Sequence, residues 1–229
     1  MPFANRLDAG RQLAAAVIRH HYESPVVLAL PRGGVPVGAA VAAAIGAPLD
    51  LLLVRKLGVP FQPELAMGAI VDGASPTIVR NDEVIDAIGI SDEDFQAVCR
   101  RELLEVERRR RAYVGHRAPV EIAGKTAVVV DDGVATGATM RAALRSATAR
   151  HPLRLIMAVP VAPADTLRQL RREVDDIVCL EAHDLFDAIG TYYADFTQVR
   201  DEEVVRLLNE SPRPLDRPAR SSADGRGGT

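Results

Sequence analysis

Short apolar runs alternate along the chain with segments that carry apolar residues at helical spacing. The apolar runs have strand length and few polar positions, which is typical of parallel strands buried on both faces. They cover residues 26–30, 49–54, 127–130, 153–159 and 177–180. The helical patterns cover residues 5–22, 35–45, 140–150, 164–173 and 201–208. This alternation predicts an α/β fold, in which a central parallel sheet is flanked by helices and joined by right-handed crossovers.

The region 81–115 interrupts the alternation and predicts a helical insert. A short helix is expected at 82–88, and Ser91 is placed to cap a long helix after it, with Asp94 three residues further on. The apolar stripe of the long helix consists of Phe95, Val98, Cys99, Leu103 and Val106. Its charged face includes four arginines at 108–111, which we interpret as solvated and ion-paired rather than as a phosphate site. The insert is expected to act as a lid, a hood or a dimer contact.

Composition narrows the class of protein. A length of 229 residues with 48% hydrophobic content fits one domain with a sizeable core, and a net charge of -3 gives no sign of nucleic acid or an anionic membrane as partner. The two cysteines lie in unrelated segments, so we expect no disulfide framework and a cytoplasmic location. We also expect no signal peptide and no membrane span. The domain is placed at 1–210, and 211–229, rich in Pro, Arg, Ser and Gly, is expected to be a disordered tail.

The densest candidate chemistry follows the apolar run at 127–130. Two carboxylates, Asp131 and Asp132, precede a loop of small residues that ends at Thr139, where a helix begins. Glycines in this loop let backbone N–H groups turn inward, and the helix adds its positive dipole end, so the loop is predicted to bind phosphate. The carboxylates would repel a bare phosphate, but they suit ribose hydroxyls or Mg²⁺. Together these features indicate a site for a phosphorylated sugar.

The run Asp131-Asp132-Gly-Val-Ala-Thr-Gly-Ala-Thr139 resembles the phosphoribosyl pyrophosphate (PRPP) motif of type I phosphoribosyltransferases. The resemblance covers most of 1–210 and is nearest to a bacterial group of predicted phosphoribosyltransferases with the same loop and a comparable helical insert. It implies that Asp131 and Asp132 contact the ribose hydroxyls and bind Mg²⁺ directly or through water. It also implies that the 5′-phosphate is held by Ala135, Thr136, Gly137, Ala138 and Thr139. Ala138 departs from the glycine of many members and narrows the pocket slightly.

Two more segments lie at predicted strand ends. Arg32, Gly33 and Gly34 follow the run at 26–30, and a cation with two glycines suits close approach to an anion. Lys56 follows the run at 49–54, at the edge where open α/β sheets bind ligands. The resemblance implies that all four residues bind the pyrophosphate of PRPP, with Lys56 also catalytic. A bland surface turn and a solvated cation remain the alternatives.

Residues 57–73 are rich in Gly and Pro and predict a loop that moves over the site, with a small hairpin pairing 69–71 with 77–79. Glu64 is the one titratable residue in 57–70. In the family, adenine-type members place a Glu in this loop and have Ala at the position of Ala135, where 6-oxopurine members have Asp. The resemblance therefore implies Glu64 as a catalytic acid or base and argues against hypoxanthine or guanine as acceptor.

The aromatic residues gather near the end of the domain. A planar base needs a ring to stack on, so Tyr192, Tyr193 and Phe196 are candidates for base binding, with plain packing as the alternative. Sequence motifs of other enzyme classes are missing. There is no His-Glu-x-x-His for a metal, no Gly-x-Ser-x-Gly for a hydrolase and no Gly-x-Gly-x-x-Gly for a dinucleotide. Gly124-Lys125-Thr126 lacks the first glycine of a Walker A loop.

The resemblance implies an Mg²⁺-dependent transferase of nucleotide salvage. It would move the ribose 5-phosphate of PRPP onto a small nitrogenous base and release pyrophosphate. The expected assembly is a homodimer, without nucleic-acid or membrane partners. Two other functions stay open, namely a PRPP-sensing regulatory protein without catalysis and a hydrolase that uses water as the acceptor.

Overall fold

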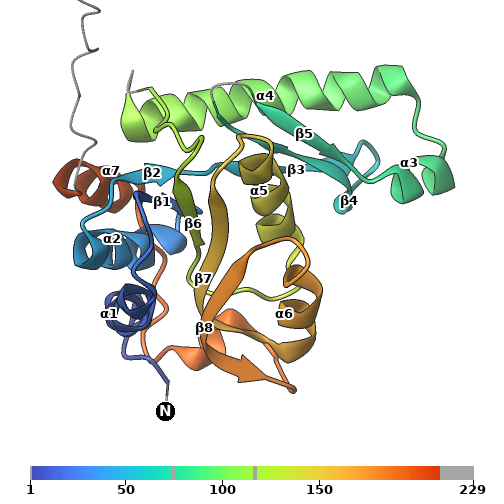
Figure 1. Ribbon diagram of the computed structural model, residues 1–229. Helices are drawn as coiled ribbons and strands as arrows, with labels where there is room; N and C mark the ends of the chain where they lie inside the picture. Colours follow the sequence, from blue (N-terminus) through green and yellow to red (C-terminus); the bar gives the residue numbers. More distant parts are fainter. Residues whose placement is uncertain (1, 74–75, 116–117, 212–229) are drawn as a thin grey trace, which may run out of the picture.

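The computed structural model describes residues 2–73, 76–115 and 118–211, apart from the side chain of Glu64. A five-stranded parallel sheet lies at the centre, with the strand order β2-β1-β6-β7-β8 (Figure 1). Its strands are β1 (Pro25–Ala29), β2 (Leu49–Leu51), β6 (Thr126–Val130), β7 (Arg154–Pro163) and β8 (Asp176–His183). The predicted α/β class with a central parallel sheet is confirmed. The tail expected at 211–229 lies, apart from its first residue, outside the described residues.

Helices cover both faces of this sheet (Figure 1). One face carries α1 (Arg6–Val17) and α2 (Gly34–Ile45), and the other carries α5 (Ala138–Thr148) and α6 (Ala164–Leu170). Successive residues of β1 enter different cores, because side chains alternate between the two faces of a strand. Val27 packs with residues of α1 and α2, whereas Leu28 packs with residues of α5 and α6. The remaining elements beside the sheet are η1 (Ile18–His20), η2 (Ile189–Tyr192) and α7 (Asp201–Glu210).

A second, antiparallel sheet corrects two expectations about the middle of the chain. Its strands are β3 (Val54–Val59), β4 (Gln62–Val71) and β5 (Thr77–Arg80), in that order. The parallel strand expected at 49–54 ends at Leu51, and the chain has already entered the second sheet at Val54. The segment expected to be a mobile loop, 57–73, forms the end of β3 and all of β4. The predicted pairing of 69–71 with 77–79 is confirmed.

The glycines that suggested a loop instead let the strands approach closely. A Cβ atom on Gly58 would lie 2.5 Å from the carbonyl oxygen of Pro63. A Cβ atom on Gly68 would lie equally close, at 2.5 Å, to the carbonyl oxygen of Val79. Glycine inside a strand marks such approaches and bulges, and the β3–β4 register does shift on either side of Gly58.

The helical insert at 81–115 is confirmed by α3 (Asp82–Ile88) and α4 (Asp92–Val114). Ser91 caps α4 as predicted, because its hydroxyl accepts the N–H of Asp94 at 3.1 Å. In Figure 1, α4 runs across the top of the second sheet. Within the described part of the chain, no helix is both long and apolar enough to cross a lipid bilayer.

The apolar stripe of α4 packs inside the chain. Phe95, Cys99 and Val106 are buried and share one core with Leu57 of β3 and Met67 of β4. The expectation that this stripe is spare for a dimer contact is therefore wrong. The homodimer stays a prediction, and the buried stripe of α4 does not support it.

One arginine of the run at 108–111 is not solvated. Arg110 contacts both carboxylate oxygens of Asp50 at 3.1 Å and one of Asp72 at 2.5 Å, and its side chain is only 14% exposed. It thereby ties α4 to the strand β2 and to the end of β4. Arg109 follows the predicted i,i+4 pattern and pairs with Glu105 at 2.7 Å.

Candidate functional site

The loops that follow the neighbouring strands β1 and β6 are packed against each other. A Cβ atom on Gly33 would collide with Oδ2 of Asp132, and Gly34 faces the backbone in the same way. A Cβ atom on Gly34 would lie 2.8 Å from the carbonyl oxygen of Val130 and 2.9 Å from Cα of Asp131. Only glycine fits at these two positions. Because neither glycine has a side chain, Arg32–Gly34 and the acidic pair can lie in direct contact at one edge of the sheet.

The acidic pair is a concentration of negative charge with one guanidinium beside it. Oδ1 of Asp131 accepts the N–H of Asp132 at 2.8 Å, and Oδ2 of Asp132 accepts Nε of Arg6 at 2.7 Å. Burial, followed by the charge of Asp132, raises the pKa of Asp131 well above its usual range. Burial also raises the pKa of Asp132, although Arg6 opposes the shift. Hydroxyl donors or a cation at this point would stabilise the ionised carboxylates.

The loop before α5 is held in place by a residue of the following helix, α6. Gly137 has φ of 77°, and a Cβ atom on it would lie 2.8 Å from Cγ2 of Thr166. The hydroxyl of Thr166, in α6, donates to the carbonyl oxygen of Ala135 at 2.9 Å. Thr136 is exposed and Thr139 half-buried, and no described side chain caps the N-terminus of α5. Its first N–H groups therefore remain available to an anion.

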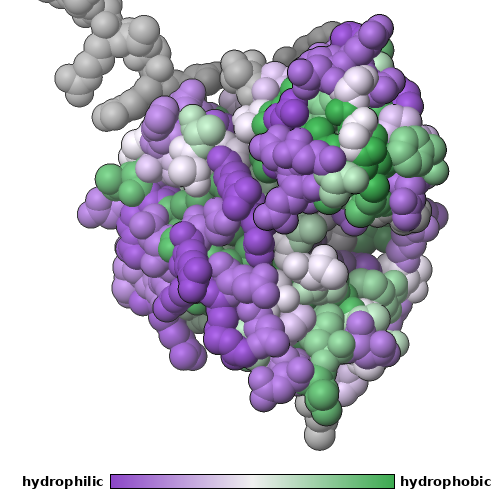
Figure 2. All heavy atoms as spheres, turned by 90° about the vertical axis from the view of Figure 1, so that its right-hand side faces the viewer, coloured by the Kyte–Doolittle hydropathy of each residue, from purple (hydrophilic) through white to green (hydrophobic). Residues whose placement is uncertain are grey.

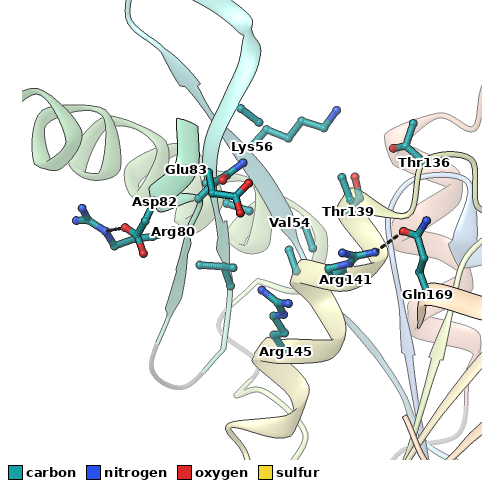
Figure 3. A pocket seen from close by; sticks show the side chains of 17 residues that line it. Val54, Lys56, Arg80, Asp82, Glu83, Thr136, Thr139, Arg141, Arg145 and Gln169 are labelled. Carbon is teal, nitrogen blue, oxygen red and sulfur yellow. Dashed lines mark hydrogen bonds and ion pairs between the residues drawn. The ribbon is translucent and has the colours of Figure 1, made fainter. Parts of the chain in front are cut away.

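Lys56 lies across a cavity from this loop. The cavity has a volume of about 640 Å³ and separates the second sheet from α5. Figure 3 shows Lys56 extending from β3 toward the side on which Thr136 and Thr139 lie. From outside, Figure 2 shows a hollow below the lobe that the second sheet forms. The expected position of Lys56 at the end of a parallel strand is wrong, because Lys56 lies within the antiparallel strand β3, and its role toward pyrophosphate stays a prediction.

A second cavity joins Lys56 to the helical insert. It has a volume of about 500 Å³ and shares Lys56 and Thr139 with the first. Its other cationic lining residues are Arg55, Arg101 and Arg109, of which the last two come from α4. Glu102 lines the same cavity and pairs with Arg55 at 2.6 Å and with Arg101 at 3.1 Å, so most of this positive charge is already paired. Arg109 pairs with Glu105 in this wall, as expected from the interpretation of the arginine run as an ion-paired face.

Arg32, at the other end of the site, is linked to the closing helix. Its Nη1 lies 3.5 Å from Oδ1 of Asp201 at the start of α7. The same oxygen accepts the hydroxyl of Tyr113 from the last turn of α4 at 2.8 Å. Burial, helped by Asp201, raises the pKa of Tyr113 to about 12, so the hydroxyl stays a donor at neutral pH. The loop at 32–34 is therefore connected to both α4 and α7.

Two site residues carry no local signal in the sequence. Arg6 lies 126 positions from Asp132 and is one of many arginines. Arg141 lines the first cavity, and Figure 3 shows it bonded to Gln169 at 3.0 Å. Its Nε is buried, and among the described residues it has no hydrogen-bond partner. Only the position of Arg141 one turn into the phosphate-loop helix could have suggested a role.

Two of the three aromatic rings proposed to bind a base, those of Tyr193 and Phe196, are in contact with other side chains. Tyr193 is buried, packs against Phe3 and Phe196, and donates its hydroxyl to the carbonyl oxygen of Asp132 at 2.5 Å. The guanidinium of Arg6 lies 3.8 Å from the ring centre of Phe196. These contacts support the packing alternative for Tyr193. A base-binding role for Phe196 stays a prediction.

Tyr192 and Glu64 also remain predictions. Tyr192 is half-buried, and its ring lies 5.0 Å from that of Phe186 and 4.5 Å from that of His183. Glu64 belongs to β4, a paired strand rather than the expected loop, and its side chain is outside the described part of the structure.

Comparisons with known proteins agree with this architecture. The sequence model described as phosphoribosyl transferase domain matches residues 3–196. Two curated proteins from Mycobacterium tuberculosis, each called a "Putative phosphoribosyl transferase", are 45% identical over 211 residues, which is 92% of this chain and 47% of each relative. The crystal structure of the protein TT1426 from Thermus thermophilus is similar with a TM-score of 0.80 and 38% identity, covering 93% of this chain and 100% of that one.

The chain therefore belongs to the phosphoribosyltransferase family. It spans about half the length of the two mycobacterial relatives, at 47%.

Proposed function

We propose that this chain transfers the ribose 5-phosphate of PRPP to a small nitrogenous base with release of pyrophosphate. One observation carries the proposal: Gly33 and Gly34 pack directly against Asp132 and Asp131 at the carboxyl edge of β1 and β6. This contact brings a loop suited to pyrophosphate beside carboxylates suited to a ribose. The uncapped N-terminus of α5 completes the site for the 5′-phosphate.

Each part of the site has a role in this reaction. The loop before α5 binds the 5′-phosphate, and Asp131 and Asp132 accept hydrogen bonds from the ribose hydroxyls. Arg32 and Lys56, with the backbone of the glycine loop, face the leaving pyrophosphate. As the bond to C1 breaks, positive charge develops on the sugar and negative charge on the leaving group. Fixed carboxylates and cations near those two positions stabilise the transition state more than the ground state.

The residues present also fit a magnesium ion. Mg²⁺ is usually bound through one or two carboxylates, several waters and the phosphates of the substrate. Asp131 and Asp132 offer such a pair, and burial opposes their ionisation unless positive charge is near. Among the described residues, no cluster of three or more His, Cys, Asp or Glu would hold an ion alone. The ion, when bound, would neutralise the pyrophosphate leaving group.

The test is pyrophosphate release from PRPP and Mg²⁺ across a panel of purine and pyrimidine bases. Asp132→Asn is expected to lower the rate by about 10²-fold or more, because a charge beside the reacting sugar is lost. Asp86→Asn, an exposed substitution in α3, is the matched control and should leave the rate unchanged. Release that depends on one base names the acceptor, and Ala135 leads us to expect a base other than hypoxanthine or guanine.

Other results would replace the proposal. Pyrophosphate release that is the same with and without bases would make the protein a PRPP hydrolase. Saturable PRPP binding without any release across the panel would favour a PRPP-sensing regulatory protein. Absence of PRPP binding would overturn all three functions.

A further inference from the structure

Arg6 is enclosed by groups that lie far along the chain. Its Nε donates to Oδ2 of Asp132 at 2.7 Å, and its Nη1 donates to the carbonyl oxygen of Thr197 at 2.8 Å. The face of its guanidinium lies over the ring of Phe196, 3.8 Å from the centroid. The side chains of Arg6 and Asp132 are each only 11% exposed. A charged pair held from three sides and shielded from water is far more rigid than a surface ion pair.

The backbone around Arg6 is fixed to the same part of the chain. The N–H of Phe3 donates to the carbonyl oxygen of Tyr192 at 2.8 Å, and the N–H of Ala194 donates back to Phe3 at 2.8 Å. The N–H of Asp195 donates to the carbonyl oxygen of Ala4 at 3.0 Å. The segment 2–6 and the segment 192–197 therefore form one unit, and Arg6 projects from this unit toward the acidic pair.

Asp132 is held on its other sides as well. Its carboxylate lies against Gly33, where a Cβ atom would collide with Oδ2, and its carbonyl oxygen accepts the hydroxyl of Tyr193. Arg6, Asp132 and Gly33 thus form a continuous contact from the start of α1 to the pyrophosphate loop. If Arg6 were absent, the carboxylate of Asp132 would lose the side-chain donor that fixes its rotamer.

Given the function proposed above, on which this inference rests, we propose that Arg6 is a positioning residue for the ribose site. It fixes the orientation of the Asp132 carboxylate that accepts the ribose hydroxyls, and it touches neither phosphate. Removing Arg6 should therefore weaken recognition of the ribose while the phosphate loop binds its anion as before. That separation distinguishes positioning from a general loss of structure.

The experiment compares two ligands by calorimetry, ribose 5-phosphate and inorganic phosphate, for wild type, Arg6→Gln, Arg6→Lys and Arg11→Gln. The preference of wild type for ribose 5-phosphate measures the ribose contacts. Arg6→Gln should reduce this preference by about 3–10-fold, the effect of misdirecting one or two hydrogen bonds, with phosphate affinity unchanged. Arg6→Lys should restore part of it, because lysine returns the charge but not the second donor to Thr197. Arg11→Gln, exposed on the same helix, should match wild type.

Turnover gives a second readout. If wild type releases pyrophosphate, Arg6→Gln should lower kcat by about 10–100-fold, as expected for a misplaced catalytic carboxylate, while KM for PRPP changes far less. All measurements are made well below the unfolding temperature of each variant, which circular dichroism establishes first.

The outcomes separate this inference from the proposed function. Equal weakening of both ligands, or an undiminished ribose preference in Arg6→Gln, would overturn the role of Arg6 alone. A wild type that prefers ribose 5-phosphate but never releases pyrophosphate would overturn the transferase and leave the Arg6 test intact. A wild type without any ribose preference would overturn the ribose site, and both proposals with it.

Discussion

The two sheets of this protein use apolar residues differently. Every residue of β6 is buried, and so is every residue of β1 except the first, because helices cover the parallel sheet on both faces. In β5 of the antiparallel sheet, half-buried and exposed residues alternate, and β3 is exposed at Lys56. A strand buried on both faces is a continuous apolar run in the sequence, whereas a strand that lines a cavity is not. This difference explains why the parallel strands were predicted from the sequence while most of β3 and β4 was expected to be a loop.

The two regions also divide the site between them. The parallel sheet presents the glycine loop, the acidic pair and the phosphate loop on one edge, all from short segments next to strands. The antiparallel sheet and α4 add a charged wall with Lys56 and the ion pair of Arg55 with Glu102. Ligand binding by the loops of the parallel sheet should be sensitive to any added side-chain volume. The contribution of the antiparallel sheet and α4 should depend mainly on their charges and on the contacts that hold them to the parallel sheet.

The largest effect is expected where the two regions are joined, at Arg110. Replacing Arg110 with Met leaves Asp50 and Asp72, each with a side chain only 3% exposed, without their cation. Breaking a buried ion pair by removing one partner lowers the free energy of unfolding by about 3–5 kcal/mol. Urea denaturation measures this change. Arg108→Met, an exposed partner of Glu105, serves as the control and should unfold like wild type. Equal stability of the two variants would contradict a role for Arg110 in joining the regions.

A smaller effect on stability, but a larger one on binding, is expected within the parallel region. In Gly33→Ala the new methyl group meets Oδ2 of Asp132, so the two loops must move apart. Overpacking of this kind lowers the free energy of unfolding by about 1–3 kcal/mol, and PRPP binding should be lost with it. Gly33 has φ of -59°, so its variant adds a close contact without backbone strain, whereas Gly89→Ala, at φ of 73° with no atom within 4 Å of the new Cβ, adds backbone strain without a contact. Thermal unfolding and calorimetry distinguish the two, and normal PRPP binding by Gly33→Ala would refute the close contact.

The smallest effect is expected at the link between Arg32 and α7. Asp201→Asn keeps a partner for the hydroxyl of Tyr113 but removes a carboxylate 3.5 Å from Arg32. PRPP should bind up to about 5-fold more tightly, because Arg32 is no longer shared with a competing anion and the pair is partly exposed. Glu202→Gln removes the same charge from the next residue and should change affinity less. Weaker binding by Asp201→Asn would instead mean that Asp201 holds Arg32 in its working position.

Much of the fold, including the elements that carry the acidic pair, could be predicted from local pattern. The strand, loop and helix around Asp131 and Thr139 are specified within 24 residues, 127–150, by an apolar run, small residues and a helical period. The hairpin of β4 with β5 carried a turn signal and was predicted with its pairing. The errors lie where residues far apart decide the environment: Arg110 of the supposedly solvated run bonds to Asp72 and Asp50, which lie 38 and 60 positions away.

The sequence by itself determined the parallel sheet and the strand, loop and helix around the acidic pair, because an apolar run, small loop residues and a helical period act within a few residues of each other. Tertiary structure alone decided which charges surround them. Arg6 reaches Asp132 across 126 positions, and the side chain of Arg110 is 14% exposed while that of Arg109 is 42% exposed. The energy of a charge depends on its burial and on its partners, and both are set by packing between distant segments rather than by the neighbouring sequence.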